Sequence, residues 1–112
     1  MKKFLIVYHA TADAMEQMAK LTPEQQKAGM DPWMSWAKEC GSALVDLGTP
    51  LANGKSLTPQ GAVGSRKEVT GYSIMQADSM DRVLGLLKKH PHFMMPGQCS
   101  IEVHEALALP GM

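Results

Sequence analysis

Residues 3–9, KFLIVYH, decide the fold of this chain. They are rich in β-branched and aromatic side chains, which is typical of a strand. Successive side chains of a strand point to opposite faces, so both faces here are apolar: one carries Phe4, Ile6 and Tyr8, the other Leu5 and Val7. Such a strand has to be covered on both sides. In a chain of 112 residues, helices can supply one cover and a second subunit is the economical source of the other.

Composition narrows the class of protein. The chain has 11 basic and 11 acidic residues and is 45% apolar, which fits one globular domain, residues 1–112. Balanced charge excludes a nucleic-acid module, because phosphate binding needs an excess of Lys and Arg. The apolar run 4–8 is shorter than a signal peptide (about 7–15 residues) or a membrane span (about 20). Two scattered cysteines, Cys40 and Cys99, build no disulfide scaffold. We therefore expect a cytoplasmic protein with no membrane or nucleic-acid partner.

The first half of the chain predicts helices. Residues 10–21 fit either a short helix or an ordered loop, whereas residues 22–25, TPEQ, form a capping box that starts a helix. Pro32 cannot continue that helix without losing a hydrogen bond. We expect a break near 29–31, with Asp31 as the N-cap of a second piece that runs to Cys40.

The second half predicts strands around one more helix. Asn53-Gly54 is a two-residue hairpin signal, so short ribbon strands are expected at about 49–52 and 56–58. An apolar stripe at i, i+3, i+4 and i+7 predicts a helix over 79–90. The remaining strands are expected at 43–47, 66–77 and 99–105.

The order of these elements predicts the topology. The order is strand, helix, strand, then a hairpin region, then strand, helix, strand. This order is typical of a split βαβ arrangement. We expect a ferredoxin-like α+β fold, with an antiparallel sheet and helices on one face. The open face then needs a cover, in agreement with the first strand.

A series of segments in a fixed order suggests a family: the first strand, 22–24 (TPE), 33–36, 41–48 (GSALVDLG), 67–72 (KEVTGY), 77–79, 90–92 (HPH), 101–103 and 109–112 (LPGM). Through these segments, which span nearly all of its length, the chain resembles the YCII-related proteins, in the branch named for a DGPF motif. The resemblance implies a homodimer whose sheets pair as a dimeric α/β barrel, and some members that act on small molecules through a His/Asp pair. The DGPF segment itself is absent, and residues 60–63, QGAV, stand roughly in its place.

Five residues are candidates for a site. His9 ends the first strand and can act as a general base, since histidine titrates near neutral pH, and Asp46 can orient it. Trp33 and Trp36 offer an apolar wall, with His92 beside it. The competing interpretation is structural: a satisfied histidine, an exposed carboxylate, and tryptophans that pack helix on sheet.

Metal and cofactor binding have weaker support. His90-x-His92, with His104, would suit a metal, but a helix end and loop explain the pair as well, and we expect no metal. No GxGxxG or Walker pattern occurs, so no cofactor is expected. Three functions stay open: a homodimer that binds a small apolar or aromatic molecule between the first helix and the sheet, a cofactor-independent lyase or isomerase that uses His9 and Asp46, and a purely structural dimer.

Overall fold

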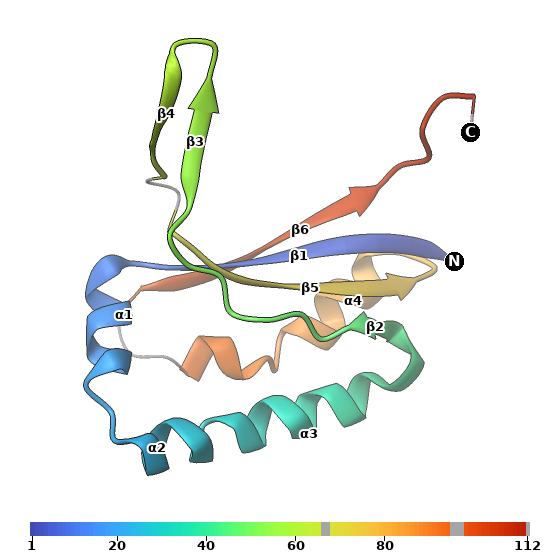
Figure 1. Cartoon of the computed structure of the whole chain (residues 1–112). Helices are drawn as coiled ribbons and strands as arrows, with labels where there is room; N and C mark the ends of the chain where they lie inside the picture. The colour runs from blue at the N-terminus through green and yellow to red at the C-terminus, as the bar shows by residue number, and fades with distance from the viewer. Residues whose placement is uncertain (66–67, 95–97, 112) are drawn as a thin grey trace.

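The computed structural model describes residues 1–65, 68–94 and 98–111. Four strands form one antiparallel sheet in the order β2-β5-β1-β6. All the described helices lie against one side of it (Figure 1). Each βαβ unit is split by a strand of the other unit, so the predicted ferredoxin-like α+β fold is confirmed. The sheet strands are β1 (Lys2–Ala10), β2 (Leu44–Asp46), β5 (Val69–Ala77) and β6 (Cys99–Ala106); the helices are α1 (Ala12–Ala19), α2 (Pro23–Ala28), α3 (Met30–Cys40) and α4 (Met80–Leu87).

The first strand divides its side chains between two environments, as predicted. Phe4 and Ile6 are fully buried and Tyr8 is 1% exposed, and all three belong to the core under the helices. Leu5, on the other face, is 42% exposed. Because the helices lie on one side only (Figure 1), the opposite face of the sheet stays open.

The helical region starts as predicted and breaks at Gly29, within the predicted range 29–31, but the second helix is capped two residues earlier than predicted. Thr11 caps α1, which settles that segment as a helix, and Thr22 and Gln25 form the reciprocal bonds of the capping box. The prediction of Asp31 as an N-cap is wrong: α3 begins at Met30, after Gly29 with φ −66° and ψ −18°. Gly29 stays near helical geometry, so Asp31 and Pro32 both fall in the first turn, where a missing N–H costs nothing.

The ribbon exists, but its position and its turn differ from the prediction. It consists of β3 (Lys55–Thr58) and β4 (Gly61–Gly64), joined through residues 59–60 rather than through Asn53-Gly54. The reason is a contact with the main sheet: Pro50 bridges Gly71, and the Leu51 N–H donates to the Thr70 carbonyl at 3.0 Å. Residues 49–52 therefore run along β5 and cannot fold back as a ribbon strand.

The last three predicted elements form with shifted ends. Ser79 caps α4, which stops at Leu87 instead of residue 90. The His90 N–H donates to the Leu87 carbonyl at 3.0 Å, and a 3-10 turn, Pro91–Met94, follows. β5 begins at Val69, after Glu68 with φ 55°; residues 66–67, predicted to start it, lie outside the described residues. None of the described helices has the length and apolar character needed to span a membrane.

Candidate functional site

An apolar cavity of about 250 Å³ lies between the helices and one end of the sheet. Tyr8 of β1 and Gly71 of β5 contribute to its sheet side, and Trp33 of α3 to its helix side. Three of the ten methionines, Met15, Met18 and Met30, line it as well. Methionine is flexible and polarizable, so these walls can adapt to the outline of a ligand.

The loop after β2 closes one side of the cavity, and Gly48 allows it to do so. Gly48 has φ 79°, and a Cβ there would lie 1.8 Å from the Tyr72 carbonyl oxygen. Only glycine lets the loop approach β5 so closely. The Ser73 hydroxyl holds it there by donating to the Leu47 carbonyl at 2.6 Å. Residues 47–50 thereby become a wall of the cavity.

Tyr8 and Thr70, two polar residues of the lining, use their hydroxyl groups within the protein. The Tyr8 hydroxyl donates to Ser73 Oγ at 2.8 Å, since that oxygen's own proton goes to Leu47. Burial raises the pKa of Tyr8 to about 12, so its hydroxyl stays neutral. Thr70 donates to the Tyr8 carbonyl at 3.2 Å. None of the described lining residues is Lys, Arg, Asp or Glu, so the cavity favours an uncharged ligand.

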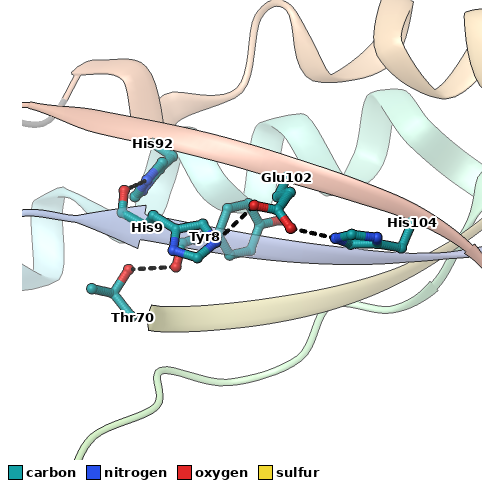
Figure 2. Close-up of polar contacts among 6 residues, drawn as sticks. All are labelled: Tyr8, His9, Thr70, His92, Glu102 and His104. Atoms are coloured by element: carbon teal, nitrogen blue, oxygen red, sulfur yellow. Dashed lines mark hydrogen bonds and ion pairs between the residues drawn. The ribbon is translucent and has the colours of Figure 1, made fainter. Parts of the chain in front are cut away.

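His92 brings the one imidazole into the lining. Its Nε2 lies 2.8 Å from the His9 carbonyl oxygen, which only accepts, so Nε2 carries the proton (Figure 2). In the neutral ring, Nδ1 is then a hydrogen-bond acceptor. Cys99 donates its thiol to the His92 carbonyl at 3.3 Å. His92 is 4% exposed and is held in place from β1 and β6.

Behind the cavity, His90 is enclosed by three aromatic rings. Ring centroids lie 4.3 Å away in Trp36, 4.4 Å in Trp33 and 4.8 Å in Tyr8. His90 Nδ1 accepts from the His92 backbone N–H at 2.9 Å, so the ring proton lies on Nε2, which has no hydrogen-bond partner within the described residues. Burial, and after it the nearby His92, lower the pKa of His90 to about 3. A neutral His90 therefore supports the Trp33 wall.

The structure does not bring His9 and Asp46 together. Asp46 ends β2, two strands away from β1, and its carboxylate accepts from the Gly48 N–H at 2.8 Å. The carboxylate near His9 is Glu102, with 3.7 Å between Nε2 and Oε2. The other oxygen of Glu102 bonds His104 Nε2 (Figure 2). The catalytic role of His9 stays a prediction, but its partner in this geometry is Glu102.

The three predicted ligand-binding residues separate into two groups. Trp33 and His92 line the cavity. Trp36 does not: it is 3% exposed, and its indole N–H donates to the Leu86 carbonyl at 2.9 Å, which is the packing role left open from the sequence. Tyr8 also lines the cavity without having been a candidate, because alternation along the first strand placed it only on the face that it shares with Phe4 and Ile6. Within residues 1–65, 68–94 and 98–111, no three His, Cys, Asp or Glu side chains gather as a metal site.

Comparison with known proteins adds support for the fold. No family model matches the chain, and no curated protein does. Among solved structures, the chain is similar to 5-chloro-2-hydroxyhydroquinone dehydrochlorinase (TftG) from Burkholderia phenoliruptrix AC1100 in complex with 2,5-dihydroxybenzoquinone. The TM-score is 0.52 at 14% identity, over 89% of this chain and 90% of that one. At this identity the likeness shows the shared fold alone.

Proposed function

We propose that the chain is a homodimeric, YCII-related protein that binds a small uncharged aromatic molecule in the cavity beside Trp33. The observation that carries this proposal is the lining of the cavity, which is rich in aromatic and thioether side chains. Among its described members there is no Lys, Arg, Asp or Glu, and His92 is the one histidine. A single substituted ring fits, because a dry cavity of roughly 150 Å³ already holds benzene and this one measures about 250 Å³. The similar dehydrochlorinase was solved with a six-membered quinone ring, which agrees with a ligand of this size.

The homodimer is proposed from the open face of the sheet. Leu5 of β1 is 42% exposed and Val45 of β2 is 47% exposed, and the described helices lie against the other side of the sheet (Figure 1). A second sheet laid on this face would bury both and would give the barrel that the resemblance implies.

A second candidate is cofactor-independent proton transfer, as in a lyase or isomerase. The observation in its favour is His92, whose Nδ1 is the acceptor nitrogen of a ring that lines the cavity. A bound hydroxyl or acidic C–H could give its proton to that nitrogen. In this version the proton-transfer residue is His92 rather than the predicted His9.

The methionines make binding measurable residue by residue. With ¹³C-methyl methionine, we expect titration with p-cresol to shift the methyl signals of Met15, Met18 and Met30 in a saturable way. Met34 lies one helical turn beyond Met30, is 55% exposed and does not line the cavity, so its signal should stay in place. The charged analogue 4-hydroxybenzoate should bind at least about tenfold more weakly.

Paired variants complete the test. Met30→Glu places a carboxylate in the wall and should abolish the shifts of the other lining methyls, while Met34→Glu on the same helix should leave them intact. If p-cresol moves exposed and lining methyls alike, or none at about 10 mM, the cavity is not an aromatic-binding site.

A further inference from the structure

The ribbon β3–β4 stands away from the body of the molecule as an arm. Figure 1 shows it rising on the side of the sheet opposite the helices, beside the open face. We call residues 54–65 the arm; a hydrogen bond from the Ser65 N–H to the Gly54 carbonyl at 2.9 Å closes its base. Every residue in it is exposed, and Leu57 and Val63 are 81% and 63% exposed.

An unsupported arm of this kind is poorly stable by itself. A lone two-stranded hairpin is marginal in water, and independent stability needs a third strand or a packed face. The described residues provide neither, because β3 pairs only with β4. The arm therefore fits a molecule in which something outside this subunit packs against it.

Gly64 indicates which face of the arm is approached. It lies in a strand without a positive φ, and a Cβ added there would meet no atom within 4 Å. Nothing in the described part of the subunit therefore requires glycine at this position, although glycine weakens a strand and often marks the close approach of another backbone. Gly64 pairs with Lys55, and Ala62 with Leu57, so these four share one flat face. The opposite face carries Ser56 and Val63.

A second copy of this chain is the occupant that fits the position and the area. The three long strands have 9, 9 and 8 residues, which at ~3.3 Å per residue and ~4.8 Å between strands gives a face of about 400 Å² in projection. A stable interface buries about 800 Å² on each partner. The open face is thus small for a stable dimer even though its side chains give it more accessible surface than its projection. The arm beside it offers additional apolar area to a partner that covers the face.

We infer that the arm clasps the second subunit of the dimer through the face formed by Leu57, Ala62 and Gly64. This inference rests on the proposed homodimer, and it names the element that holds it together. The arm turns a shallow sheet-to-sheet contact into a two-part interface. Its own strands become ordered by the same contact.

Light scattering after size exclusion, over a range of concentrations, tests the clasp. The wild type should give about 24 kDa, twice the chain mass of 12.2 kDa. Leu57→Glu should raise the dimer dissociation constant by about tenfold or more, as loss of a buried anchor does. Ser56→Glu, the same charge on the opposite face of the same strand, should leave it unchanged. All are compared by circular dichroism, and Leu57 is exposed enough that the fold should survive the change.

Gly64→Val gives a second, independent readout. Valine favours a free strand, so an undocked arm would tolerate it or gain stability, whereas a clasped arm would lose dimer affinity. If the wild type is a dimer and both variants dimerise equally well, the clasp is refuted while the proposed dimer stands. A wild-type monomer at about 100 µM refutes both. In either case p-cresol binding is measured separately, so failure of the cavity proposal is distinguishable.

Discussion

Acidification should destabilise this protein through one buried ring, His90. Its pKa is about 3 in the folded protein, against 6.5 in an exposed histidine, because burial at 1% exposure disfavours the charged ring. Between these two values the unfolded chain binds the proton and the folded chain does not. The contribution of His90 to stability is therefore complete above about pH 6.5 and decreases as the pH falls toward 3.

The size of the effect follows from the difference between the two pKa values. Each pH unit below 6.5 costs about 1.4 kcal/mol, so the free energy of unfolding should fall by about 2 kcal/mol between pH 7.5 and pH 5. Urea unfolding, followed by the fluorescence of the two tryptophans, measures this fall. Protein concentration is held constant, since a dimer's stability depends on it.

The comparison variant is His90→Asn. The Asn side-chain oxygen can take the place of Nδ1 and accept from the His92 N–H, while the titrating ring is gone. The variant is expected to be less stable throughout, with a flatter pH dependence by about 2 kcal/mol over the same interval. Equal slopes for the two proteins would refute the assignment. So would NMR titration of the His90 ring of the folded wild type showing protonation at pH 5.5, a readout that does not depend on the variant folding.

Two further predictions concern the core beside the cavity. Trp36→Ala should lower the free energy of unfolding in urea by about 3–5 kcal/mol, because the indole is buried and bonded to Leu86. Trp33→Ala should lower it clearly less, since Trp33 borders the cavity. Equal losses in the two variants would contradict this division. Burial, followed by the nearby Glu39, raises the pKa of Cys40 from 9 to about 11, so the folded state holds its proton at a pH where the unfolded state has lost it. Between pH 8 and pH 10, the free energy of unfolding should fall by about 1.5 kcal/mol more in the wild type than in Cys40→Ala. Parallel curves for the two proteins would show that this thiol does not contribute.

The sequence predicted those parts of the fold that depend on neighbours along the chain. Alternation assigned both faces of β1, and the capping box at 22–25 fixed the start of α2. The position of the hairpin turn was predicted wrongly because a contact between residues far apart in the sequence decides it. Asn53-Gly54 is the better local turn, but the bridge from Pro50 to Gly71 commits the preceding segment to the main sheet.

The candidate site was predicted only where position along one element was enough. Trp33 faces the cavity because of its place on α3, and His92 because of the turn after α4. The partner of His9 could not be predicted in this way, because Glu102 becomes its neighbour only through the order of strands in the sheet. The enclosure of His90 likewise needs β1, α3 and the segment after α4 to converge.

The backbone of β1 links the two sides of the sheet. The side chain of His9 lies on the open side with Glu102, whereas its carbonyl oxygen holds the ring of His92 in the cavity wall. The carbonyl of Tyr8 is fixed in turn by Thr70. The register of β1 against β5 shifts at this step, between Tyr8 and His9, whereas its pairing with β6 continues without a shift. A subunit packed on the open face would fix the His9 side chain, and with it the carbonyl that orients the one imidazole lining the cavity. In the proposed dimer, the shape of the cavity would therefore be linked to the subunit contact through His9.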